Sequence, residues 1–93
     1  MKLLNTENNL VGQWLFDNGK LHNDEVALRI DWLIHNYLKK LASDTTGWYV
    51  LYEDPNDKRF WELTYPHSEL QGGGPPSLKQ ISIEEARQKY SLN

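Results

Sequence analysis

The stretch NDEVALRIDWLIHNYLKKLA, residues 23–42, contains the pattern that decides the fold class of this chain. Its apolar residues recur at steps of three and four, which places them on one face of an α-helix. Asn23 or Asp24 can cap the first turn, and Lys39 and Lys40 suit the negative end of the helix dipole. The pattern therefore predicts one long helix that ends near Ala42 and buries Val26, Ile30, Leu33, Ile34, Tyr37, Leu38 and Leu41.

Strand-forming residues flank this helix on both sides. Before it, Leu10–Phe16 is apolar and aromatic, and residues 17–19 (Asp-Asn-Gly) favour a tight turn. After it, residues 47–53 and 59–65 are β-branched and aromatic runs that predict a hairpin. Asp54-Pro55-Asn56-Asp57 joins them and favours a type I turn with Pro55 at its second position.

The faces of the hairpin are only partly fixed by the sequence. Trp61, Leu63 and Tyr65 alternate with Phe60, Glu62 and Thr64, and the first set is expected to face the core. The partner strand is apolar on both faces, and a shift of one residue in register swaps them. It therefore stays open whether Trp48, Val50 and Tyr52 or Tyr49 and Leu51 join Trp61, and whether the first strand pairs with the hairpin or with residues 78–81.

The C-terminal part predicts a loop, a strand and a short helix. Pro66–Pro76 has the composition of a loop, and Leu78–Ile81 can form one more strand. Ser82 and Glu85 have the spacing of a capping box at the start of a last helix. The whole chain, residues 1–93, is thus expected to form one α+β domain: a mostly antiparallel sheet of about four strands, covered on one face by the long helix, with a short C-terminal helix.

Composition narrows the class of function. The 93 residues carry 13 acidic and 10 basic side chains, a net charge of −3, which argues against a nucleic-acid partner. The absence of cysteine excludes disulfides and sulfur-ligated zinc, and it fits a reducing compartment. Met1–Glu7 lacks the apolar stretch of an export signal, and the longest apolar run, Trp48–Tyr52, is far too short to span a membrane. We expect a cytoplasmic protein that has no membrane partner.

The histidines and glycines do not form a recognisable site. Asp31 and His35 are four residues apart on the helix and predict a surface ion pair rather than a metal site. His67-Ser68-Glu69 contains triad residue types, but a triad depends on geometry across the fold and not on adjacent positions. Gly72–Gly74 precedes two prolines instead of the Lys and Ser or Thr of a nucleotide loop. No catalytic residue, metal or cofactor is expected.

Two groups of side chains suggest a protein partner. Leu28 and Trp32 are neighbours on the side of the helix opposite the core stripe, where they either bind a partner or are covered by the N-terminal segment or the last helix. Carboxylates and aromatics gather at the hairpin and the loop after it, which suits a basic partner or is simply a solvated hairpin edge. The candidate contact residues are Leu28, Trp32, Glu53, Asp54, Asp57, Glu62, His67, Glu69 and Gly73.

Several segments between about Val11 and Tyr90 resemble the immunity protein 27 family. They are RIDWLI at 29–34, DPND at 54–57, WELTYP at 61–66, GGGPP at 72–76, and the pairs Glu85-Ala86 and Lys89-Tyr90. The resemblance implies a role in bacterial polymorphic-toxin systems, in which a member protects the producing cell by binding a cognate protein toxin. It brings no catalytic residues, so it implies a toxin inhibitor that is not an enzyme.

Two alternatives to a toxin inhibitor remain at the level of sequence. One is a small-ligand or enzyme domain that uses a pocket near Gly72–Gly74, with His67 beside Glu62 or Glu69. The other is a homodimer joined through an exposed strand face or through Leu28 and Trp32.

Overall fold

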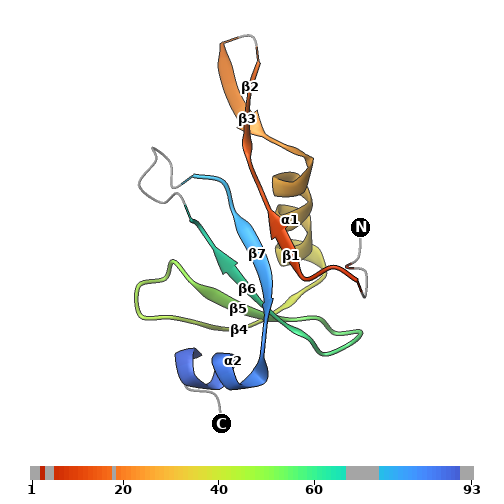
Figure 1. Cartoon of the computed structure of the whole chain (residues 1–93), viewed down its shortest axis with the longest axis vertical. Coiled ribbons are helices and arrows are strands. Elements are labelled where there is room, and N and C mark those ends of the chain that lie inside the picture. Colours follow the sequence, from red (N-terminus) through yellow and green to blue (C-terminus); the bar gives the residue numbers. More distant parts are fainter. Residues whose placement is uncertain (1–2, 4–5, 18, 67–73, 91–93) are drawn as a thin grey trace.

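The described part of the chain forms a five-stranded sheet, a separate two-stranded ribbon and two helices (Figure 1). The computed structural model describes residues 3, 6–17, 19–66 and 74–90. The elements are β1 (Asn9–Val11), β2 (Trp14–Asp17), β3 (Lys20–Asn23), α1 (Glu25–Asn36), β4 (Lys39–Ser43), β5 (Val50–Glu53), β6 (Phe60–Thr64), β7 (Ser77–Ile81) and α2 (Ile83–Tyr90).

The five strands are antiparallel and lie in the order β1-β7-β6-β5-β4, which confirms the α+β class and a mostly antiparallel sheet. The expected first strand is in fact two strands. β1 pairs with β7, whereas β2 turns back onto β3, and this ribbon projects beyond the sheet at the top of Figure 1. The sheet therefore has five strands instead of about four.

Helix α1 begins as the sequence indicates but ends earlier. Asp24 is the N-cap, and its Oδ1 accepts a hydrogen bond of 2.8 Å from the amide of Ala27. At the other end, the amides of Tyr37 and Leu38 both donate to the carbonyl of Leu33, which closes the last turn. Tyr37, with φ −127°, has left the helical region, so the prediction of a helix up to Ala42 was wrong.

The residues after α1 form β4, an edge strand that pairs with β5. Leu38 packs in the core on the α1 side of the sheet, while Leu41 and Ala42 pack against the cluster on the other side. Apolar residues at steps of three suit a helix, but a register shift in β4 between Lys40 and Ala42 allows a strand to place the same residues in the core. The sequence has no Gly or Pro to mark the end of the helix. Pairing with β5 therefore decides where the helix ends and overrides the helical pattern.

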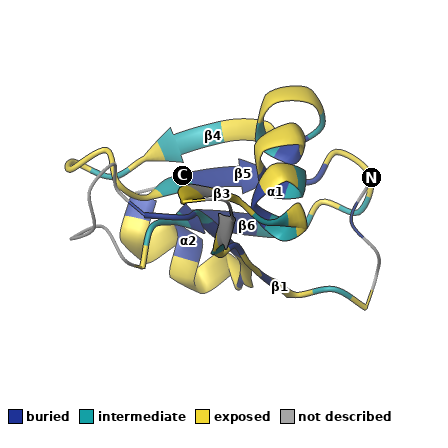
Figure 2. Cartoon of the chain, turned by 90° about the horizontal axis from the view of Figure 1, so that it is seen from above, coloured by how far each residue is buried: buried dark blue, intermediate teal, exposed yellow. Residues whose placement is uncertain are grey.

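Two apolar clusters pack on opposite faces of the sheet. The larger holds Ile30 and Leu33 of α1 against Trp61, Leu63 and strand residues beside them. The smaller holds Ala86 and Tyr90 of α2 against strand residues of the opposite face. The long helix covers one face as expected, and α2, whose place the sequence left open, covers part of the second face; Figure 2 shows β5 and β6 buried between the two helices.

The structure settles the register of the hairpin. Tyr52 lies opposite Trp61, and Val50 lies opposite Leu63, so Val50 and Tyr52 share the α1 face with Trp61. Trp61 and Leu63 are buried there as expected. Glu62, on the other face, is also buried because α2 lies over it.

Helix α2 starts at the capping box that its sequence predicts. The amide of Glu85 donates to the Ser82 hydroxyl at 3.1 Å, and that hydroxyl lies 3.5 Å from the Glu85 carboxylate. Ile81 and Ala86, on either side of the cap, are both buried in the smaller cluster.

Replacing Gly12 by alanine is expected to lower the free energy of unfolding by about 1–3 kcal/mol, as overpacking does. A Cβ at Gly12 would lie 2.6 Å from the Pro76 carbonyl oxygen and 2.9 Å from the Ala27 Cβ. The same carbonyl accepts a hydrogen bond of 2.9 Å from the Gly12 amide. The backbone before the β2–β3 ribbon therefore cannot move away from Pro76 without losing this hydrogen bond. Urea titration of both proteins measures the change, with Gln13→Ala as control. Equal midpoints for Gly12→Ala and wild type would contradict this tight approach.

Candidate functional site

Leu28 and Trp32 are exposed on the outer face of α1. Their exposed fractions are 55% and 36%, and neither α2 nor the described part of the N-terminal segment covers them. Asp31 and His35 lie on the same face and form the expected surface pair, with 3.3 Å between Asp31 Oδ1 and His35 Nδ1. The sequence left open whether Leu28 and Trp32 bind a partner or are covered by another part of the chain. In the structure, no described element covers them.

Tyr37 connects this helix face to the turn between β5 and β6. The Trp32 and Tyr37 rings are stacked, with 6.5 Å between centroids and 17° between planes. The Tyr37 hydroxyl then donates a hydrogen bond of 2.7 Å to Asp54 Oδ1, at the start of the turn. We call Leu28, Trp32, Tyr37 and residues 54–57 the helix–turn surface. Two groups that the sequence analysis treated separately are therefore adjacent.

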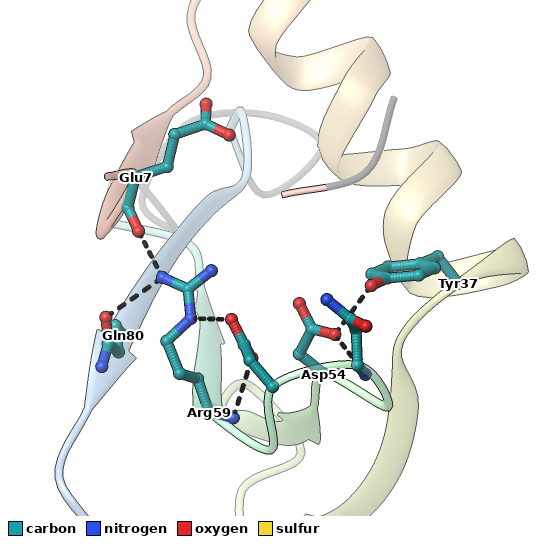
Figure 3. Close-up of polar contacts among 7 residues, drawn as sticks. Glu7, Tyr37, Asp54, Arg59 and Gln80 are labelled. Carbon is teal, nitrogen blue, oxygen red and sulfur yellow. Dashed lines mark hydrogen bonds and ion pairs between the residues drawn. The ribbon is translucent and has the colours of Figure 1, made fainter. Parts of the chain in front are cut away.

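The turn is shaped by Asp54, whose side chain is 1% exposed (Figure 3). Its Oδ1 accepts the Asn56 amide at 2.8 Å, and its carbonyl accepts the Lys58 amide at 2.9 Å. The Asp54 amide donates to the carbonyl of Arg59, and Lys58 has a left-handed φ of 66°. The loop is thus wider than a two-residue turn, and Asp54 holds both the loop and Tyr37 in place.

Arg59 fastens the far side of the turn to the N-terminal segment. Its Nε lies 2.5 Å from Asp57 Oδ2, and its Nη1 lies 2.6 Å from the carbonyl oxygen of Glu7 and 3.4 Å from Gln80 Oε1. The guanidinium also lies 4.9 Å from the centroid of the Trp61 ring.

Glu7 is held from a second direction as well. Its carboxylate accepts two hydrogen bonds from Arg29 of α1, at 2.5 and 2.7 Å. The N-terminal segment thus links α1 to the turn, and Figure 3 shows Glu7 and Gln80 converging on Arg59. Sequence reasoning missed Glu7 and Arg59, because a Glu in a polar lead and an Arg in a strand carry no signal of a pairing across 52 residues.

The structure brings only some of the candidate residues together. Leu28, Trp32, Asp54 and Asp57 belong to the helix–turn surface or its support. Half-buried Glu53 lies opposite Lys39 of β4 in the sheet. Glu62 lies under α2, on the other face of the sheet from Trp61. The remaining candidates, His67, Glu69 and Gly73, lie outside the described residues.

Glu62 is part of a polar cluster between the sheet and α2. Its Oε2 accepts a hydrogen bond of 2.7 Å from the Tyr90 hydroxyl and lies 2.9 Å from Lys89 Nζ. Lys89 Nζ also lies 3.9 Å from the centroid of the Tyr49 ring. Burial, and then the hydrogen bond to Glu62, raise the pKa of Tyr90. The cluster satisfies a buried carboxylate and holds α2 on the sheet.

Tyr37→Phe is expected to change how stability depends on pH. Desolvation, and then the hydrogen bond and charge of Asp54, raise the pKa of Tyr37 from 10.0 to about 12. The folded state therefore keeps a proton that the unfolded state loses, so this stabilisation is present below pH 10 and is lost as the pH rises from 10 to about 12. Urea titrations from pH 8 to 12 should show wild type losing more stability than Tyr37→Phe, and parallel curves would contradict the Tyr37–Asp54 bond.

Several hollows lie beside the described elements, and two of them border residues that matter here. One, of about 300 Å³, lies between the ribbon, α1 and the ends of β6 and β7, with Trp14, Asp31 and Tyr65 among its lining residues. The other, of about 500 Å³, lies on the face that α2 leaves open, with Thr64 and Lys79 in its lining. Within the described ranges, no group of three or more His, Asp or Glu side chains is placed to hold a metal ion. No helix in that part of the chain is long and apolar enough to cross a membrane.

These features define a small α+β protein with an exposed helix face joined to a braced turn. The family model of immunity protein 27 matches residues 16–82, which include all of α1, the β5–β6 turn and β7. The chain belongs to the immunity protein 27 family, as its sequence segments indicated, and the family implies an immunity role. No curated protein and no solved structure matches it.

Proposed function

We propose that this immunity protein binds and neutralises a cognate bacterial toxin through the helix–turn surface, without chemistry of its own. The observation that carries the proposal is the continuity of that surface. Leu28 and Trp32 are exposed apolar side chains on a rigid helix, and Tyr37 fixes Trp32 against a turn that is itself braced by Asp54 and Arg59. Preorganised aromatic anchors of this kind carry much of the affinity in protein interfaces.

The charges around the helix–turn surface favour a basic partner. Glu25 and Asp31 are exposed on the outer face of α1, and Asp57 lies in the turn. The chain as a whole has a charge of −3. Complementary electrostatic potentials on two proteins accelerate their association and orient them. The apolar centre of the interface, which is buried in the complex, mainly sets the rate of dissociation. We propose that Leu28 and Trp32 fill pockets on the toxin, that the exposed carboxylates of Glu25 and Asp31 contribute to orientation, and that Asp54 and Asp57 keep the turn in its binding shape.

The described residues favour a binding role over the enzyme alternative. The hollow beside Gly74 has one carboxylate among its described lining residues, Asp31, and no described histidine. Acid–base chemistry commonly combines two titratable groups whose environments separate their pKa values. The helix–turn surface, in contrast, has the aromatic centre that a protein interface needs.

Co-expression with the neighbouring open reading frame, the candidate source of the toxin, tests the proposal in cells. We expect the toxin alone to stop growth, the wild-type chain to restore it, and a Leu28→Glu, Trp32→Ala double variant to restore it poorly while accumulating to the same level. A neighbouring product that is harmless on its own would refute the immunity role.

Light scattering of the chain alone at several concentrations tests the homodimer alternative. A monomer at every concentration would leave that alternative without support.

A further inference from the structure

The hollow of about 300 Å³ beside α1 has the lining of a site for a cationic side chain. Its lining includes the half-buried aliphatic residue Ile34 and the half-buried aromatic residues Trp14 and Tyr65. Asp31 is the only carboxylate in the described lining, and Asn23 adds an amide. A hollow that combines an aliphatic residue, two aromatic residues and one carboxylate suits a long side chain that ends in a positive charge.

Asp31 has acceptor capacity left for such a ligand. Its side chain is 68% exposed, and one oxygen lies 3.3 Å from His35 Nδ1 on the next turn of the helix. A carboxylate offers about four lone-pair sites, so a single neighbour leaves room for a second donor.

We propose that this hollow receives an arginine side chain of the toxin, an assignment that rests on the proposed function. The guanidinium is favoured over an ammonium because its plane stacks on aromatic rings and its fork of donors matches a carboxylate. Its three methylene groups would lie along Ile34, which is half-buried. The net charge of −3 and the Asp31 carboxylate make the site complementary to a cation.

The hollow adjoins the surface that the proposed function uses. Asp31 follows Leu28 by three residues and directly precedes Trp32, and all three are exposed on α1. Residues three apart are neighbours on a helix surface. One partner can therefore cover Leu28 and Trp32 while it inserts an arginine beside Asp31.

Titration with N-acetyl-arginine amide tests the site without the toxin. The readout is the NMR signal of the Trp14 indole N–H in the ¹⁵N-labelled chain, assigned by Trp14→Phe. We expect a saturable shift, and Asp31→Asn should weaken binding about three- to tenfold, the range for a charge-assisted contact at an exposed carboxylate. Glu25→Gln is the matched control, because it removes one exposed charge from the same helix outside the hollow.

Three results would overturn the assignment: no shift of the Trp14 signal, equal binding by Asp31→Asn, or equal binding of the neutral citrulline amide. These outcomes are independent of the immunity role. If arginine amide fails to bind while the chain still protects cells, the arginine site falls and the proposed function stands. If arginine amide binds as expected but the neighbouring gene product is harmless, the proposed function falls and the cation site remains.

Discussion

Trp32→Ala is expected to weaken binding of the toxin by about 2 kcal/mol or more, roughly thirtyfold in Kd, as loss of an aromatic hot-spot residue does. Trp32 is 36% exposed in the free chain, and a partner can cover this exposed part. Its stacking on Tyr37 restricts the ring before binding, which lowers the entropy that association must overcome. Calorimetric titration of the purified toxin into each protein measures the difference.

The fold should tolerate this change, because Trp32 belongs to neither of the two core clusters. We expect a loss of about 0.5–3 kcal/mol in the free energy of unfolding, the usual range for a single substitution. Tyr49→Ala is the matched control: Tyr49 is 37% exposed and lies in the loop between β4 and β5, at the end of the sheet opposite the helix–turn surface. Equal affinity of wild type and Trp32→Ala, or an equal loss in Tyr49→Ala, would exclude the helix–turn surface as the centre of the interface.

Arg59→Ala is expected to lower the free energy of unfolding by about 2–4 kcal/mol, since it breaks a partly buried ion pair together with other charge-assisted contacts. The Arg59 side chain is 14% exposed, and Asp57 would remain in a site that solvent reaches poorly. The contact with Trp61, at 4.9 Å from the ring centroid, would be lost at the same time. Urea titration at neutral pH measures the change.

The N-terminal segment should loosen selectively in Arg59→Ala. Because Arg59 holds the carbonyl of Glu7, amide hydrogen exchange of β1 should accelerate more than that of β5. Arg87→Ala removes an exposed arginine of α2 and serves as control, with an expected change within about 0.5 kcal/mol. A loss no larger than that of Arg87→Ala would contradict the role of Arg59 as a link between turn and N-terminal segment.

Local patterns predicted much of the fold. The start of α1, the capping box at Ser82 and the hairpin around Asp54 each depend on residues within a few positions of one another. The end of α1 could not be predicted, because Leu38 and Leu41 suit a helix as well as a strand and only pairing with β5 decides between them. The ribbon was missed for a related reason. Gly12 interrupts the apolar run that was expected to form one strand, and the two halves pair with different strands: β1 with β7, and β2 with β3.

The sequence predicted the exposed residues of the candidate site but not the buried polar contacts that hold them in place. Leu28 and Trp32 stand out because they are apolar residues on the polar side of a helix. Asp54 and Glu62 were expected as surface charges, yet the structure gives each a buried side chain and a tyrosine donor. Such pairings join residues 17 and 28 positions apart, and no spacing rule reaches that far.

A stoichiometric inhibition assay tests the central claim most directly. The activity of a fixed amount of purified toxin is measured while the chain is added in small steps. Occlusion by binding predicts a linear fall to zero at a fixed whole-number ratio, an unaltered mass of the toxin and recovery of its activity after denaturation and separation. Inactivation of many toxin molecules by one molecule of the chain, with a lasting change in the mass of the toxin, would contradict the claim.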